Sequence, residues 1–245
     1  TITDYGNDNA FGGSDDRSAE DTVTIRIIGE DKEPDGEDEG TASTDPRTSY
    51  TPEDKFGPSG FIPSGVDPST GQGFIQPGQM MAYRIEFWNK EDAEVPTQDA
   101  DIVDDLDPEV FDLSTFEFTR IGFLDWDVVL PSGQTSIDEW IDARPEMNLA
   151  VHVTGNIDFE TGRVYWWFHC VDPETGDYPD DPNVGFLPPF NPVTQYELGW
   201  VEYRVRAVDD LSTGAEIRNQ ARVRFDFLPW GDPPSVEDRW NDDAW

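Results

Sequence analysis

The sequence predicts an all-β protein built as an antiparallel β-sandwich, with an N-terminal β-hairpin extension and an irregular C-terminal tail. The clearest indication is the alternation of apolar and charged residues in two runs, 198–208 and 215–227. A period of two places apolar side chains on one face of a strand and charges on the other, as in a half-buried antiparallel strand. The turn-rich segment 209–214 separates the two runs, so we expect them to form a hairpin.

Further apolar runs predict the remaining strands of the sandwich. They cover residues 80–88, 100–106, 115–124, 127–130, 149–154 and 164–171, with Pro- and Gly-rich connections between them. Within 115–124 the apolar phase shifts after Phe118, which indicates a β-bulge. The segment 137–143 is the one candidate for a short helix. Eight or so strands with such connections favour a sandwich over a barrel with alternating helices.

Composition shifts divide the chain into four parts. Residues 1–30 are predicted to form a hairpin, 31–55 an acidic Gly- and Pro-containing linker, 56–229 the sandwich domain and 230–245 a Trp-rich acidic tail. In the hairpin, Val23, Ile25 and Ile27 alternate with polar residues. A two-stranded hairpin is marginally stable by itself, so this apolar face must pack on another sheet.

Two resemblances extend this interpretation. Asp4-Tyr5-Gly6-Asn7, the Gly/Asp-rich loop after it and Asp21-Thr22-Val23-Thr24-Ile25 resemble the closing hairpin of bacterial cadherin-like and immunoglobulin-like repeats. This resemblance implies that the chain begins with the tail of a domain whose earlier strands lie upstream or in a neighbouring subunit that accepts the hairpin by strand addition. The alternative is a hairpin packed on its own domain.

The second resemblance involves segments spread over residues 56–227, among them Phe56-Gly57-Pro58-Ser59-Gly60-Phe61, Val103-Asp104-Asp105-Leu106-Asp107-Pro108 and Glu216-Ile217-Arg218-Asn219-Gln220-Ala221. They resemble an uncharacterised immunoglobulin-like domain of very large secreted or surface-displayed bacterial proteins. The resemblance implies an extracellular or cell-surface location and supplies no catalytic residues.

The charge balance restricts the partners. With 53 acidic and 16 basic residues the formal net charge is -37, which repels nucleic-acid phosphate and anionic membrane surfaces. The chain also contains no apolar run of 18 residues that would insert into a membrane. Two accounts of the acidity compete: carboxylates gathered in turns bind Ca²⁺, or acids spread over the surface reflect adaptation to high salt.

The candidate Ca²⁺ ligands lie in three acidic segments: the loop of the first hairpin, the surroundings of the short strand before Pro108, and the long loop after the tryptophan-containing strand. A turn that carries several carboxylates and exposed carbonyls brings the oxygens that Ca²⁺ needs together. They are Asp4, Asp8, Asp15, Asp16, Asp21, Asp101, Asp104, Asp105, Asp107, Asp172, Glu174 and Asp177. The alternative for each is a solvated turn residue or an Asx-turn former. Spacing does not single out one site.

The other residue types indicate structure more than catalysis. The single cysteine, Cys170, excludes an internal disulfide and a thiolate metal cage, and it alternates with Trp166 and Phe168 as a buried residue does. His152 and His169 lie within strand patterns and are interpreted as structural. Glycoside hydrolysis needs a pair of carboxylates, but a chain with 53 acidic residues contains such pairs by chance. A carboxylate pair is therefore no evidence of catalysis, and we expect no enzyme.

The tail and the outward arginines are candidate contacts between subunits. Trp230, Trp240 and Trp245 lie in a tail too polar to form a core, so they dock either on a neighbour or back on the sandwich. Five outward arginines, Arg204, Arg206, Arg218, Arg222 and Arg224, either meet an acidic neighbour or pair locally across strands.

These patterns lead to two functional hypotheses. The first is a non-catalytic extracellular structural protein, a subunit of a surface fibre, layer or adhesive stalk that is assembled from copies of itself head-to-tail by strand addition and stabilised by calcium. Its interface would include Val23, Ile25, Ile27 and the tail tryptophans. The second is a secreted carbohydrate-binding module that uses exposed tryptophans, and a glycosidase is a third, weaker reading.

Overall fold

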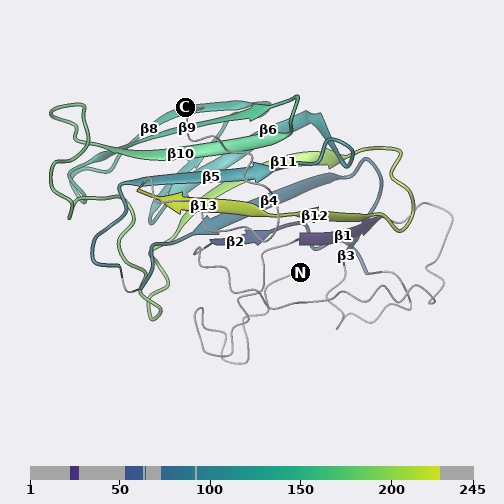
Figure 1. Ribbon diagram of the computed structural model, residues 1–245, viewed down its shortest axis with the longest axis horizontal. Helices are drawn as coiled ribbons and strands as arrows, with labels where there is room; N and C mark the ends of the chain where they lie inside the picture. Colours follow the sequence, from purple (N-terminus) through teal and green to yellow (C-terminus); the bar gives the residue numbers. More distant parts are fainter. Residues whose placement is uncertain (1–22, 28–52, 63, 65–72, 92, 227–245) are drawn as a thin grey trace.

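The computed structural model describes residues 23–27, 53–62, 64, 73–91 and 93–226, and for 23–27 it describes the backbone. This part of the chain is an all-β sandwich of two packed five-stranded antiparallel sheets, with a small three-stranded sheet at one side (Figure 1). The sandwich predicted from the sequence is thereby confirmed. Residues 1–22 of the predicted N-terminal hairpin and the predicted tail 230–245 lie outside the described residues.

The first large sheet has the strand order β13-β5-β10-β9-β8. Its strands are β13 (Ala221–Phe225), β5 (Asp99–Asp105), β10 (Arg163–Val171), β9 (Ala150–Asp158) and β8 (Ser136–Asp142). The second has the order β2-β4-β11-β6-β7. Its strands are β2 (Glu53–Phe56), β4 (Met80–Phe87), β11 (Gly199–Ala207), β6 (Phe111–Phe123) and β7 (Trp126–Val129).

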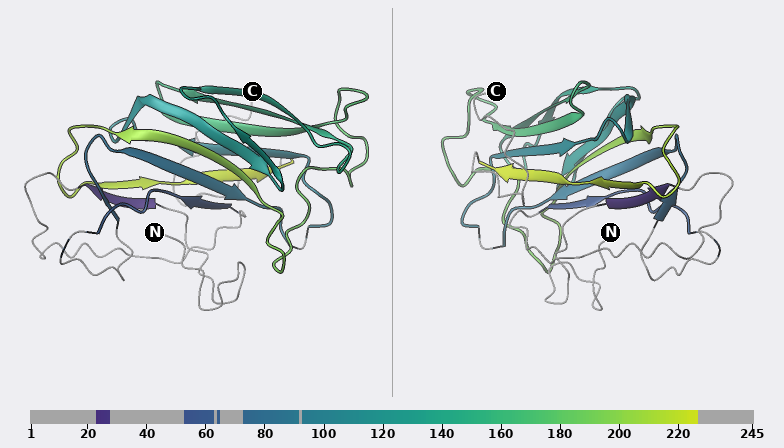
Figure 2. Two further views of the ribbon diagram at one scale, coloured as in Figure 1. Left: turned by 180° about the vertical axis from the view of Figure 1, so that it is seen from behind. Right: turned by 45° about the vertical axis from the view of Figure 1, so that its right-hand side comes forward.

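The small sheet has the order β12-β1-β3. The strand β1 (Val23–Ile27) runs antiparallel to β12 (Glu216–Asn219) and parallel to β3 (Gly73–Ile75), so it is the middle strand. In the views of Figure 2, β1 (purple) follows the side of the sandwich next to β12 (yellow-green). The most N-terminal described strand therefore pairs with two segments that are far away in the sequence.

Aromatic side chains fill the space between the large sheets. Trp166 of β10 meets Phe118 of β6 edge-on with ring centroids 5.4 Å apart, and Phe168 meets Phe87 of β4 in the same way at 5.4 Å. Such pairs add to the stabilisation that comes from area burial. Alternating residues of each strand point inward, and the burial pattern of β10, iBiBiBiBB, shows the period of two that the sequence predicts.

The hairpin predicted from residues 198–227 is wrong. β11 pairs with β4 and β6, whereas β12 and β13 pair with β1 and β5, so the two runs belong to different sheets. The second run is also divided at Gln220 into two strands of different sheets. Alternation fixes which face of a strand is buried, and both runs bury the expected face, but it does not fix the partner.

Two further predictions have clear outcomes. The short helix at 137–143 is wrong, because Ser136–Asp142 is strand β8 and pairs with β9 along its whole length. The bulge is confirmed: the register of β6 against β11 slips between Glu202 and Tyr203, whose partners are Arg120 and Phe118, so Thr119 is the extra residue.

Candidate functional site

The outer face of the sheet β13-β5-β10-β9-β8 carries the densest group of aromatic and ionisable side chains that we describe. On β10, Trp166 and Phe168 point into the core, so Trp167 and His169 point to the opposite face. The strand register extends this face sideways. Asp99, His169, His152 and Trp140 are consecutive partners across β5, β10, β9 and β8.

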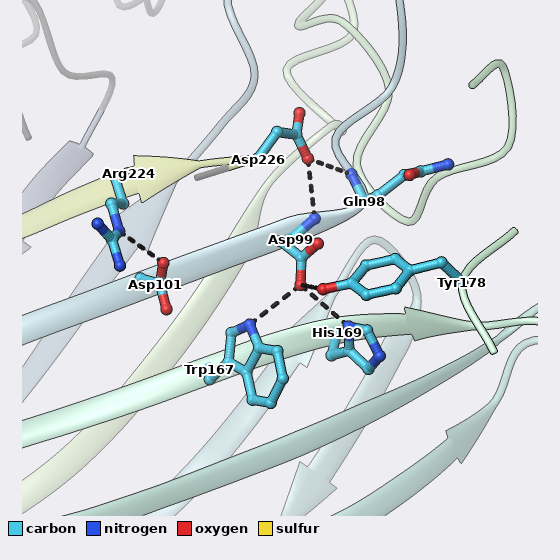
Figure 3. A network of polar contacts seen from close by, with 8 residues as sticks. All are labelled: Gln98, Asp99, Asp101, Trp167, His169, Tyr178, Arg224 and Asp226. Atoms are coloured by element: carbon cyan, nitrogen blue, oxygen red, sulfur yellow. Dashed lines mark hydrogen bonds and ion pairs between the residues drawn. The ribbon is translucent and has the colours of Figure 1, made fainter. Parts of the chain in front are cut away.

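Asp99 is the centre of a network of hydrogen bonds on this face, the Asp99 cluster, as Figure 3 shows. Its Oδ1 accepts hydrogen bonds from Trp167 Nε1 and Tyr178 OH, each at 3.0 Å, and lies 3.0 Å from His169 Nδ1. A carboxylate accepts and does not donate, so Nδ1 of His169 carries the proton in this contact. Three donors from β10 and from the loop after it therefore converge on one oxygen.

Packing holds the three donors in place. The His169 ring stacks on Trp167 with centroids 4.7 Å apart and meets the Tyr178 ring edge-on at 4.0 Å. The Asp99 side chain is 3% exposed, so its charge is shielded from water and depends on these donors. Burial raises the pKa of the Tyr178 hydroxyl, and the negative charge of Asp99 raises it further.

A neighbouring acid, Asp226, holds the backbone around Asp99, and a second acid, Asp101, lies close by. Asp226 Oδ1 accepts from the backbone N–H groups of Gln98, at 2.9 Å, and of Asp99, at 3.0 Å (Figure 3). Two residues further along β5, Asp101 Oδ2 accepts from Arg224 Nε at 2.7 Å. Burial raises the pKa of Asp101 above its ordinary value, while the Arg224 guanidinium acts in the opposite direction.

A second Trp–His–Asp group lies at the far edge of the same face. The Trp140 ring stacks on His152 with centroids 4.2 Å apart and an interplanar angle of 10°. His152 Nε2 lies 2.7 Å from Asp138 Oδ1. Trp140 is 59% exposed, which leaves much of this side chain open to solvent. Both histidines of the chain thus lie between a tryptophan and an aspartate.

This arrangement places oriented polar groups beside flat aromatic rings. Each aspartate orients a histidine, and each histidine lies against a flat apolar tryptophan ring. Flat rings beside oriented hydrogen-bonding groups suit ligands that have an apolar face and polar edges.

The described candidate Ca²⁺ ligands do not gather into one site. Asp101 pairs with Arg224, and Asp105 pairs with Arg163 at 2.9 Å. Asp107 and Asp172 each accept the backbone N–H two residues on, as Asx-turn residues do. Asp104 is buried in the core, and Glu174 and Asp177 lie in the exposed turn that follows β10.

In the part of the chain that the structure describes, no group of three or more His, Cys, Asp or Glu side chains is arranged to hold a metal ion. The remaining candidates, Asp4, Asp8, Asp15, Asp16 and Asp21, lie outside the described residues. Trp230, Trp240 and Trp245 also lie outside the described residues. Val23, Ile25 and Ile27 lie in β1, of which the structure describes the backbone.

The arginines contact groups of their own chain. Arg204 pairs with Glu117, Arg218 with Glu216 and Arg222 with Asp105. Arg206 donates to the Gly78 carbonyl at 3.1 Å. Because β11 and β12/β13 belong to different sheets, the five arginines do not form one stripe. Each of the five arginines thus has a partner within its own chain, although Arg218 and Glu216 lie on the same strand rather than across strands. Contact with a neighbouring subunit stays a prediction.

The Asp99 cluster was only partly visible in the sequence. The spacing Trp167-x-His169 on a predicted strand places both side chains on one face, which was a usable signal. The convergence on Asp99 was not predicted, because it needs the pairing of β5 with β10.

The fold defines the chain as an all-β sandwich protein. A scan against protein-family models gives no match, and a search of curated proteins gives no similar sequence. Among the described residues, no helix is long and apolar enough to cross a membrane.

Proposed function

We propose that the chain is a non-catalytic structural module of an extracellular or cell-surface assembly, and that copies of it join by exchanging strand β1. The observation that carries this proposal is the position of β1 as the middle strand of a sheet whose other two strands, β12 and β3, come from the sandwich domain. Both edges of β1 are hydrogen-bonded in this position. Without β1, the edges of β12 and β3 that face each other would have no partner, and the gap between them would accept one strand.

The connection of β1 to the domain is long enough to permit exchange. Residues 28–52 join β1 to β2, and an extended chain of this length spans about 80 Å. The same β1 segment therefore reaches the slot of its own domain or that of a neighbour. Exchange of an identical element between copies needs no new interface, because the contacts in both arrangements are the same. Exchange that does not close on itself gives a head-to-tail polymer.

The finer parts of this proposal come from the sequence. The resemblance of residues 4–25 to the closing hairpin of a cadherin-like repeat supports a place among the repeats of a large surface protein, where adjacent repeats are a second class of partner. Calcium stabilisation is proposed for the first acidic loop, since the described carboxylates form no group of three that could hold a metal ion. A thermal melt with and without a chelator tests it: bound Ca²⁺ raises the midpoint, and identical melts reject it.

Removal of β1 tests the proposal at the level of assembly. We expect light scattering and electron microscopy to show oligomers or fibres for the full chain, and monomers for a variant that lacks residues 1–30. A variant that lacks residues 1–20 retains β1 and serves as the matched control, so it should assemble. Moderate salt is needed in all samples, because a net charge of -37 repels neighbouring copies. Monomers from the full chain, or unchanged assembly without β1, would reject the proposal.

The outer face with the two Trp–His–Asp groups favours a second candidate function, glycan binding. Sugars offer apolar ring faces to tryptophan and hydroxyl groups to carboxylates, and Trp140 is the most exposed ring on this face. A glycan array with the full chain tests this. Binding that is lost in Trp140→Ala but kept in Val129→Ala, which removes a 72% exposed side chain from β7, would support it. A blank array would exclude it for the glycans tested.

A further inference from the structure

A polar cluster lies buried between the sheets, away from the outer face. It joins Lys55 of β2, Asp104 of β5, Tyr203 of β11 and Asn219 of β12. The side chains of Lys55 and Asp104 are both 0% exposed, and Asn219 is 3% exposed as a residue. Four strands that are distant in the sequence thus bring an amine, a carboxylate, a phenol and a carboxamide together in the core.

Hydrogen bonds connect these groups in one chain. Lys55 Nζ forms an ion pair with Asp104 Oδ2. Tyr203 OH donates to the same oxygen at 2.6 Å, and Asn219 Nδ2 donates to Tyr203 OH at 2.9 Å. The Lys55 amine also lies over the rings of Tyr83 and Tyr203, 5.2 and 5.6 Å from their centroids. The surroundings are therefore aromatic and dry.

The cluster is poorly explained as a stabilising ion pair. Burying two charges costs more free energy of hydration than their mutual attraction returns, unless hydrogen bonds satisfy the remaining polar atoms of both groups. Here Asp104 Oδ1 and Asn219 Oδ1 are buried and have no hydrogen-bond partner among the described residues. Both unmatched oxygens belong to groups that can take part in amide chemistry, which suggests a chemical role for the cluster.

We propose that Lys55 and Asn219 become linked by an intramolecular isopeptide bond, with Asp104 as the catalytic acid and base. Asp104 takes a proton from the Lys55 ammonium group, with which its Oδ2 is in direct contact. The free amine attacks Cγ of Asn219. Protonated Asp104 becomes a hydrogen-bond donor, and the Asn219 carbonyl oxygen is an acceptor without a partner.

The reaction then completes without any further reagent. The new Nζ–Cγ bond forms and the Cγ–Nδ2 bond breaks, while a proton passes from Asp104 through the Tyr203 hydroxyl to the departing nitrogen. The released ammonia takes the extra proton from the new amide nitrogen, so the products are the isopeptide and ammonium. Asp104 is returned as a carboxylate. The Lys55 ammonium and the Asn219 carboxamide supply every atom of these products.

The link would connect β2, the first strand of the large sheets, to β12 near the end of the described chain. Tension applied along the chain would then pass through one covalent bond, bypassing the strands between. This inference is independent of β1 exchange, because it depends on core residues of a single chain.

Mass spectrometry of the purified full chain tests the proposal. We expect a mass about 17 Da below that of the sequence, the mass of one ammonia. A tryptic digest should join the peptide of residues 219–222 to the peptide of residues 48–84, because a linked Lys55 is not cleaved. Lys55→Arg and Asn219→Ala should each restore the unlinked mass, while the matched control Lys90→Arg should keep the link.

The readout distinguishes the competing outcomes. Separate, unmodified peptides 48–55 and 219–222 from folded protein would overturn the proposal. A loss of about 18 Da with Lys55 joined to the Asp104 peptide would also overturn it, because the bond would then be a condensation with the carboxylate. The wild-type digest decides in each case, so the result does not depend on the variants folding.

Discussion

Asp99 should contribute far more to stability than its counterpart at the other Trp–His–Asp group. Asp99→Ala removes the acceptor of three hydrogen bonds, from Trp167, His169 and Tyr178. Tyr178 is 38% exposed, so its hydroxyl can hydrogen-bond to water after the substitution. The expected loss therefore comes from the two hydrogen bonds of Trp167 and His169. Hydrogen bonds to a charged group are worth about 1.5 kcal/mol each at the low end, which predicts a loss of about 3 kcal/mol.

Asp138→Ala is the matched control, because it removes the aspartate from His152 in the same way. The Asp138 side chain is 79% exposed, and exposed ion pairs of this kind contribute less than about 1 kcal/mol. Urea denaturation followed by tryptophan fluorescence measures both values, with an unchanged dependence on urea as the check for two-state unfolding. Equal losses in the two variants, or a larger loss for Asp138→Ala, would refute the argument that burial makes Asp99 the centre of the face.

Three further predictions concern single sites. Hydrogen bonds from the side chain and the backbone N–H of Arg144 lower the pKa of Asp142 to about 2. This contact therefore stabilises the fold above about pH 4 and is lost as the pH falls through about 2. NMR titration should give this pKa in the native chain and a higher one in Arg144→Gln, which loses the guanidinium but keeps the backbone donor, and an unchanged pKa in the variant would contradict the role of the guanidinium. Gly162→Ala should destabilise the fold by at least about 2 kcal/mol, because the φ of Gly162 is +77° and an added Cβ would lie 1.9 Å from the Leu106 carbonyl oxygen. The matched control Gly133→Ala, where φ is +80° and no atom lies near the added Cβ, should cost about 1 kcal/mol. Thermal unfolding measures both, and equal losses would show that the close contact at Gly162 is relieved. Burial raises the pKa of the Cys170 thiol, so iodoacetamide should label it only after unfolding, and rapid labelling of the native chain would contradict its place in the core.

The faces of the strands could be predicted from the sequence, but their partners could not. Val201, Tyr203 and Val205 are buried as their alternation predicts. The neighbours of β11 are set by how the sheets pack, which no local pattern records. The strand β8 was mistaken for a helix because Glu139 occupies an inward position between Ile137 and Ile141, which hides the period of two and leaves a spacing of four.

The candidate sites depend on contacts that are long-range in the sequence. Asp99 meets His169, and Lys55 meets Asp104, only after β5 has paired with β10 and the two sheets have packed. The acidic turns were visible from composition, yet the described ones are occupied by arginine contacts and Asx-turns. Composition counts charges, but it does not show which charges are already paired.

The exchange of β1 is tested most directly by disulfide trapping between copies. Arg26 of β1 and Glu216 of β12 are partners in the antiparallel register, at a separation that a disulfide spans. A chain with Arg26→Cys is mixed with a chain with Glu216→Cys under oxidising conditions, and Val129→Cys replaces Glu216→Cys in the control mixture. We predict a covalent dimer in the first mixture and none in the control. A disulfide that forms only within a chain carrying both cysteines, with no dimer in the mixture, would contradict exchange and leave β1 as a strand of its own domain.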